Sequence, residues 1–256
     1  MYSLKKYLSE ALIKRKISNY DNDNDDEVVD FGLSVKWLKY NLAGNKLTDD
    51  ESDYGYYYQW GDTIGYPDIT KHAFNWSTTP YIKSTSGPTF TKYVTKSTYG
   101  TVDNKTTLDP EDDAVTSLLG SKYRMPTKDE YKELCKHCTG SNNIYEEPTG
   151  TLTNTNSVSK NGIYRVGKGT IIDGVKYKNP GILFVGQDIT KRIFFPAAGY
   201  YDGLNNIKQI ESIYWSSSIY SNKSSASFSL LINNSIVCRE NAWHRYSGLP
   251  IRGVKK

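Results

Sequence analysis

The sequence lacks any long apolar run. None of its stretches approaches the ~20 consecutive apolar residues that a transmembrane helix needs. Residues 1–10 interleave charged with apolar side chains, so they also lack the uninterrupted apolar segment of a signal peptide. We therefore predict that the chain has no membrane span and folds in the cytoplasm in which it is made.

Cysteine and histidine are scarce, with 3 of each among 256 residues. Cys135 and Cys138 have the spacing of a zinc knuckle, but a tetrahedral site needs a second pair, which is absent. On a helix they would lie one turn apart, and we interpret them as core thiols. A third cysteine, Cys238, stands alone in a late strand region.

No catalytic or metal-binding constellation is visible. The three histidines are His72, His137 and His244, and their spacing matches neither a metal site nor a catalytic triad. No Gly-Xaa-Ser-Xaa-Gly motif and no phosphate-binding loop occurs. We predict no metal, no cofactor and no enzymatic activity.

A basic stripe is also missing. The net charge is +4, and the short basic tracts at residues 5–6 and 14–16 lie close to the N-terminus. A nucleic-acid-binding domain concentrates its basic residues on one folded face. We therefore predict no nucleic-acid partner.

Tyrosine is what the chain has in abundance. It contains 22 Tyr and 5 Trp but only 2 Met. Tyr and Trp combine a large apolar area with one polar tip, so they suit recognition surfaces as well as cores. The composition is too aromatic for a disordered chain and indicates strands joined by irregular loops.

The first 20 residues carry the pattern of an amphipathic helix. Its apolar stripe, expected to act as an anchor, consists of Leu4, Tyr7, Leu8, Ala11 and Leu12. A helix of this length is marginal alone, so we expect it to dock on its own domain, on sister chains or on another protein. Because the stripe is weak, a membrane surface is the less favoured alternative.

Residues 21–27 form an acidic segment. An EF-hand loop would need glycine and glutamate where this sequence has Asp26 and Gly32. We interpret residues 21–27 as a solvated linker and residues 28–256 as one domain.

Within residues 28–256 the pattern predicts two helices followed by a run of strands. Asp109 and Pro110 indicate a helix that continues to Gly120, and a capping box at residues 127–130 starts a second helix that ends near Cys138. Two short strands about a turn are expected within residues 28–37, and further strands at residues 54–60, 182–185, 193–195, 213–215, 226–232 and 251–254. Residues 63–107 are expected to form long loops. We predict an α+β arrangement.

Eight short stretches resemble a known family. In chain order they are residues 29–37 (VDFGLSVKW), 53–57 (DYGYY), 60–62 (WGD), 108–114 (LDPEDDA), 124–127 (RMPT), 195–200 (FPAAGY), 214–218 (YWSSS) and 250–252 (PIR). They resemble large paralogous families of Bacteroidetes and Fibrobacter proteins with a C-type-lectin-like fold, which is shared with formylglycine-generating enzymes and the variable proteins of diversity-generating retroelements. The resemblance implies a C-type-lectin-like fold with two helices, short antiparallel strands and long loops, preceded here by the N-terminal amphipathic helix.

This chain lacks the residues that two activities of lectin-like relatives require. Calcium-dependent sugar binding uses Glu-Pro-Asn or Gln-Pro-Asp followed by Trp-Asn-Asp, whereas this chain has Glu147-Pro148-Thr149 and no Trp-Asn-Asp. The formylglycine-generating branch implies a reactive cysteine pair, which the cysteine positions do not match. A binding domain is what remains.

In retroelement-diversified relatives, the ligand surface lies between the strand resembling Trp-Ser-Ser-Ser and the last strand. Carried over to this chain, the resemblance implies ligand-binding residues in that interval. They are Tyr220, Asn222, Arg239, Asn241, Trp243, His244, Arg245 and Tyr246. Arg, Trp and Tyr dominate binding hot spots, although several of these side chains could simply pack the loops.

The N-terminus departs from the family pattern, because such relatives often carry an export signal. Residues 3–12 resemble the start of many tailed-phage proteins, and the style of the chain would suit a crAss-like phage of Bacteroidetes. We hypothesise a virion protein of the head fibre, decoration or tail that binds a host-surface glycan or protein. Its helix would contact other virion proteins or form a homo-oligomer such as a trimer. The alternatives are a purely structural fibre or decoration subunit and a bacterial cell-surface adhesin.

Overall fold

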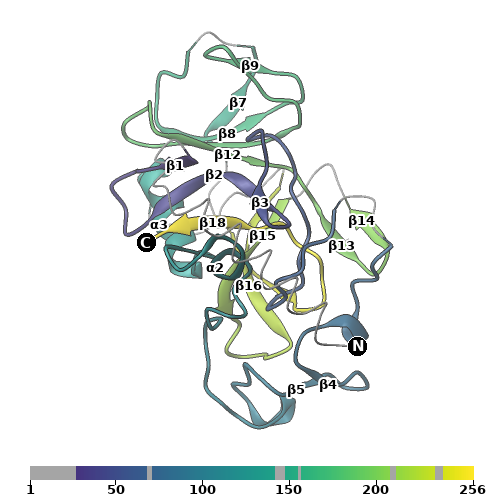
Figure 1. The fold of residues 1–256 in the computed structure, drawn as a ribbon. Coiled ribbons are helices and arrows are strands. Elements are labelled where there is room, and N and C mark those ends of the chain that lie inside the picture. The colour runs from purple at the N-terminus through teal and green to yellow at the C-terminus, as the bar shows by residue number, and fades with distance from the viewer. Residues whose placement is uncertain (1–26, 68–70, 142–147, 155–156, 208–211, 234–238) are drawn as a thin grey trace.

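The computed structural model describes residues 27–67, 71–141, 148–154, 157–207, 212–233 and 239–256 (Figure 1). The predicted helix of residues 1–20, with its five anchoring residues, lies outside the described residues, as does all of the predicted linker except Glu27.

The α+β prediction is wrong, because strands dominate the described part of the chain. That part holds eighteen short strands but two α-helices, of 6 and 12 residues. Most strands belong to several small antiparallel sheets. Both predicted helices are present but short, and most of the remaining apolar residues occupy strands.

The first sheet joins the beginning of the described chain to its end. Its strand order is β1-β2-β18-β6, with β3 paired to β2. The bounds are β1 Val28–Val29, β2 Lys36–Ala43, β3 Lys46–Leu47, β6 Tyr123–Arg124 and β18 Arg252–Lys255. Strands β1 and β2 confirm the two short strands predicted within residues 28–37. The predicted strand at residues 54–60 is wrong, because Tyr57 and Tyr58 form only isolated bridges.

The second sheet lies at one end of the molecule, at the top of Figure 1, and has the order β12-β11-β8-β7. Its bounds are β7 Gly150–Leu152, β8 Gly162–Val166, β11 Gly181–Val185 and β12 Arg192–Pro196. Strands β7 and β8 run parallel, and the other pairs are antiparallel. The hairpin of β9 (Ile171–Ile172) and β10 (Val175–Lys176) belongs to the same part of the chain.

The third sheet has the order β15-β16-β17, with bounds Ser212–Ile219, Ala226–Ile232 and Arg239–His244. Two further hairpins complete the strands: β13 (Tyr200–Asp202) with β14 (Asn205–Ile207), and β4 (Ile82–Ser84) with β5 (Thr89–Phe90). The β4–β5 hairpin lies at the opposite end from the second sheet (Figure 1). It interrupts the loops predicted for residues 63–107, as do two 3-10 turns, η2 (Trp76–Thr78) and η3 (Ser97–Tyr99).

Strand β15 is the centre of the core, because all of its eight residues are buried. Alternate side chains of a strand point to opposite faces, so Tyr214 joins one apolar cluster while Ile213 and Trp215 join another. Strand β2 bridges the same two clusters through Trp37 and Leu38. Strands β15 and β2 therefore lie between these two clusters and contribute side chains to both.

The capping-box prediction for the longer helix is confirmed. Helix α3 spans Lys128–Thr139, with Thr127 at its N-cap, and it ends at Gly140, whose φ of 73° is the left-handed conformation that glycine adopts readily. The start predicted for the shorter helix is wrong. Helix α2 spans Ala114–Leu119 with Asp113 as its N-cap, and the Asp113 carboxylate accepts from Val115 N, Thr116 N and Met125 N.

We predict that Glu130→Gln lowers the free energy of unfolding by about 1–3 kcal/mol at pH 7, because it removes a charge-assisted pair. The Glu130 carboxylate accepts from Nη1 and Nη2 of Arg124 and from Thr127 N, the last at 2.7 Å. Burial raises the pKa of Glu130, but the hydrogen bonds from Arg124 and Thr127 outweigh it and lower the pKa overall.

A lowered carboxyl pKa stabilises the fold above the unfolded-state value and loses this effect as the pH falls through the folded-state value. Urea unfolding should therefore show a smaller difference between wild type and Glu130→Gln at pH 3.5 than at pH 7. The matched control is Asp129→Asn in the same turn, whose carboxylate is exposed. An equal difference at the two pH values would contradict the prediction.

The prediction of two core thiols holds for only one of them. Cys135 and Cys138 are both buried on α3. Cys138 is free, and burial raises its pKa well above the ordinary value. Cys135 is disulfide-bonded. Disulfides persist in oxidising surroundings.

Candidate functional site

The predicted ligand-binding residues fall on β17 and on the turns at its end and between β15 and β16. Tyr220 and Asn222 lie in the β15–β16 turn, where Asn222 is exposed and Tyr220 packs edge-on against Phe228. Asn241 and Arg239 pair with Ser229 and Leu231 further along the sheet. The predicted residues are thus spread along the sheet rather than gathered at one point.

The alternation of β17 separates the two aromatic residues at its end. Trp243 is half-buried and packs against Tyr200, with ring centroids 4.8 Å apart. His244 faces the other side, where its ring contacts Trp76 and Tyr246. Trp243 therefore supports the β13 hairpin, whereas His244 belongs to a different surface.

Arg245 lies in the interior and is fully buried. Its guanidinium carbon is 4.2 Å from the Phe90 ring centroid and 4.8 Å from that of Trp60. Its Nη1 donates to the carbonyls of Lys92 and Ser224, both at 3.3 Å. This residue holds the loops under the surface and does not present a charge to a ligand.

The structure gathers five partly exposed rings into what we call the aromatic surface. They are Tyr66, His72, Trp76, His244 and Tyr246. Tyr66 and His72 stack at 3.7 Å with an interplanar angle of 12°, and His244 and Tyr246 stack at 5.3 Å and 10°. Trp76 stands edge-on to Tyr246 at 4.7 Å.

Only His244 and Tyr246 of this surface were predicted from the sequence. Tyr66, His72 and Trp76 come from the segment expected to be loop. The available signal was the density of rings within residues 66–76, in an otherwise polar stretch.

Gln59 joins the two loops that carry the rings. Its side chain is almost wholly buried, and its Nε2 donates to Tyr246 O at 2.9 Å and to the oxygens of Asn75 and Thr78 at 3.3 and 3.1 Å. Its Oε1 lies 3.3 Å from His72 Nε2. The buried Gln59 amide is thus hydrogen-bonded to both segments and joins them beneath the rings.

Trp76 is positioned by the N-cap of η2 and by the buried ring of Phe74. Asn75 caps η2 through a capping box with Thr78. Phe74 exchanges two backbone hydrogen bonds with Gly203, each of 2.9 Å, and its ring is buried against Tyr57 and Tyr201. The turn is therefore anchored to the β13–β14 hairpin.

The electrostatics of the aromatic surface favour neutral rings. Burial lowers the pKa of His72, and burial together with nearby Lys223 lowers that of His244. Burial raises the pKa of Tyr66 and Tyr246. At pH 7 the surface therefore offers uncharged flat faces and hydroxyl groups, which suit stacking and hydrogen bonding to a neutral polar ligand.

One carboxylate cluster has the geometry to hold a metal ion. Within the described residues, Asp109, Glu111 and Asp112 bring ligand oxygens within 4.8 Å of one another. The Lys92 ammonium lies 2.6, 3.3 and 2.5 Å from them in that order. Burial opposes this charge, but hydrogen bonds to Asp109 and Asp112 raise the pKa of Lys92. The Lys92 ammonium therefore occupies the position that a metal ion would take in this cluster.

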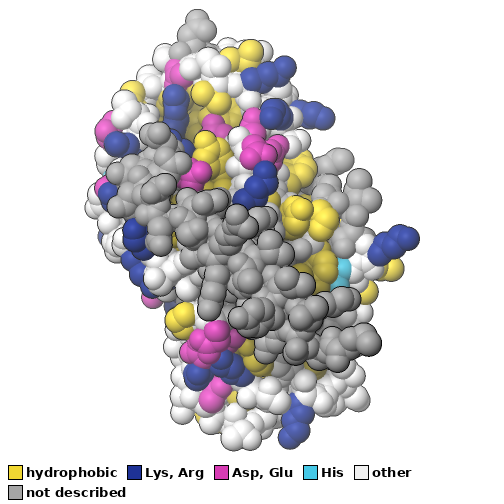
Figure 2. Space-filling view, viewed as in Figure 1, with side chains coloured by type: hydrophobic (Ala, Val, Ile, Leu, Met, Phe, Trp, Pro, Cys, Tyr) yellow, Lys and Arg dark blue, Asp and Glu magenta, His cyan; other side chains and the backbone are white. Residues whose placement is uncertain are grey.

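Figure 2 shows acidic and basic side chains interspersed on one face of the molecule. Nowhere in the described residues does a helix combine the length and the apolar character needed to cross a membrane.

Comparison with known proteins finds no similarity: no family model, no curated protein and no solved structure matches the chain.

Proposed function

We propose that the chain is a binding protein that recognises a neutral glycan through the aromatic surface. The observation that carries the proposal is five partly exposed rings, from two loops, held together by the buried amide of Gln59. Aromatic faces stack on sugar rings, and Tyr and Trp provide large contact areas at low cost in conformational entropy. Neutral histidines add hydrogen-bonding nitrogens without introducing charge.

We predict that Trp76→Ala combined with Tyr246→Ala weakens glycan binding at least tenfold, about 1.4 kcal/mol or more, because the pair forms the centre of the surface. A glycan array followed by titration of the best ligand measures the effect. Tyr99→Ala, a half-buried tyrosine in η3, is the matched control and should bind as the wild type does.

An unchanged affinity in the double variant would refute the aromatic surface as the site. A wild-type protein that binds no glycan would favour the alternative of a structural fibre or decoration subunit. Arg245→Ala is unsuitable as a test of binding, because Arg245 is buried.

The setting that we propose is the surface of a phage particle, with the N-terminal segment attached to other virion proteins or to sister chains. The motif resemblance and the helix-like pattern of residues 1–20 support this setting, and the disulfide at Cys135 suits a protein that acts outside the reducing cytoplasm. Mass spectrometry of purified particles tests it, and absence of the chain from them would leave a bacterial surface adhesin as the alternative. Native mass spectrometry with and without residues 1–20 tests the oligomer.

A further inference from the structure

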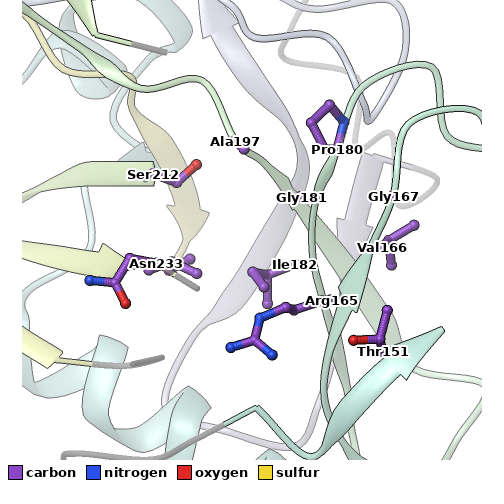
Figure 3. A pocket seen from close by; sticks show the side chains of 11 residues that line it. Thr151, Arg165, Val166, Gly167, Pro180, Gly181, Ile182, Ala197, Ser212 and Asn233 are labelled. Atoms are coloured by element: carbon purple, nitrogen blue, oxygen red, sulfur yellow. The ribbon is translucent and has the colours of Figure 1, made fainter. Parts of the chain in front are cut away.

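A cavity of about 250 Å³ opens where the second and third sheets meet (Figure 3). Strands β7, β8 and β11 provide one wall, and the ends of β15 and β16 provide the other. Residues from the two walls that matter here are Thr151, Arg165, Ile182, Ser212, Ile232 and Asn233. In Figure 3 the Arg165 guanidinium extends into the space between these walls.

Arg165 is the one residue of β8 that is not buried in the core. It pairs in register with Ile182 of β11 and with Thr151 of β7, so strands on both sides determine its direction. Among the described residues its side chain has neither a hydrogen bond nor an ion pair, and its Nε is buried without a partner. Most buried polar groups in folded proteins are paired, so a buried Nε without a partner, on a guanidinium that faces a cavity, indicates a place for an acceptor.

The lining limits the chemistry of that acceptor. Arg165 is the only charged residue among the cavity's lining residues, and the walls are otherwise apolar or neutral. One guanidinium compensates one negative charge and binds a carboxylate through two parallel hydrogen bonds. A phosphate monoester would bring about two negative charges at pH 7. The Ser212 hydroxyl already donates to Pro196 O at 2.6 Å, so it shapes the wall.

We propose that this cavity binds a small monocarboxylate of monosaccharide size, such as a sugar acid, with Arg165 as the residue that recognises the carboxylate. Thr151 and the Asn233 amide lie within reach of its hydroxyl groups, and Ile182 and Ile232 contact its apolar faces.

The cavity is separate from the aromatic surface. Strand β16 has Ala226 opposite His244 at one end and Ile232 at the cavity at the other. Seven strand residues span roughly 20 Å. A ligand in the cavity therefore does not touch the aromatic rings, and the two sites can be tested independently.

Titration calorimetry with glucuronate, glucose and glucose 6-phosphate tests the proposal. We expect saturable binding of glucuronate, with glucose and glucose 6-phosphate each at least tenfold weaker. Arg165→Gln should weaken glucuronate binding at least tenfold. Arg192→Gln is the matched control on β12, because Arg192 is already paired with Asp173, and it should leave binding unchanged.

Absence of glucuronate binding, equal binding of glucose, tighter binding of glucose 6-phosphate, or unchanged binding in a folded Arg165→Gln variant would each overturn the proposal. If Arg165→Gln does not fold, Arg165→Lys keeps the charge but loses the two-pronged geometry, and its affinity should fall several-fold; unchanged affinity would also overturn the proposal. The Trp76→Ala, Tyr246→Ala protein should bind glucuronate normally, so failure of one site is distinguishable from failure of the other.

Discussion

Replacing Arg252 with methionine is expected to reduce the free energy of unfolding by about 3–5 kcal/mol, because buried acceptors lose their only charged donor. Arg252 is fully buried, and its Nε donates to Asn41 Oδ1 at 2.9 Å. Its Nη1 donates to the carbonyls of Leu38, at 3.0 Å, and Lys39, and its Nη2 donates to Phe194 O at 2.8 Å. The guanidinium thus connects β2, β18 and β12.

Arg252→Met is expected to destabilise the fold because it leaves buried hydrogen-bond acceptors without a donor. Methionine fills a similar volume, but one side-chain oxygen and three carbonyls lose a donor in a dry interior. Burial lowers the pKa of Arg252. Hydrogen bonds to the four acceptors stabilise the charged guanidinium in the interior. Urea unfolding measures the loss. Arg192→Met, which disturbs a partly exposed pair with Asp173, should cost less than about 1 kcal/mol. A loss below about 1 kcal/mol for Arg252→Met would contradict the prediction.

Replacing Arg245 with alanine is expected to cost about 3–5 kcal/mol, as for other large buried side chains. The guanidinium is packed between Phe90 and Trp60, and its removal leaves a cavity beneath the loops. Arg245→Met should recover most of this loss. Burial lowers the pKa of Arg245 to about 9, and its Nε and Nη2 have no hydrogen-bond partner within the described part of the chain.

Methionine is therefore expected to replace Arg245 with little loss in the free energy of unfolding, but Arg252 only with a large loss. A charge with few partners gains little from burial, and an apolar residue of similar volume often replaces it without loss. Urea unfolding of the alanine and methionine variants at both positions measures the contrast. An Arg245→Met variant as unstable as Arg245→Ala would show that the charge, and not the packing, stabilises this region.

The elements that could be predicted from the sequence are those with local causes. Helix α3 begins at Thr127 because the capping box with Glu130 acts within four residues. The apolar stretches at residues 182–185, 193–195 and 226–232 form β11, β12 and β16 as expected. Helix α2 starts later than predicted because Asp113, and not Asp109, accepts the first helical N–H groups.

The fold class and the site depended on contacts that no local pattern encodes. The α+β prediction failed because the two predicted helices are short, whereas the described residues form eighteen strands, many of them only two or three residues long. Trp76 contacts the rings of His244 and Tyr246 directly, and Gln59, which lies 187 residues from Tyr246, connects His72 to the same segment. No periodicity of either segment carries that information.

By itself the sequence determined the capped start of α3, the late strands and a surplus of aromatic side chains. These features follow from backbone capping and side-chain alternation over a few residues. The tertiary structure alone decided which arginines are exposed. Arg252 reaches Leu38 across 214 residues and Arg245 lies within aromatic rings, whereas the Arg165 side chain faces a cavity and its Nε has no partner among the described residues. The reason is that burial of a charge depends on which distant carbonyls and rings the fold brings to it.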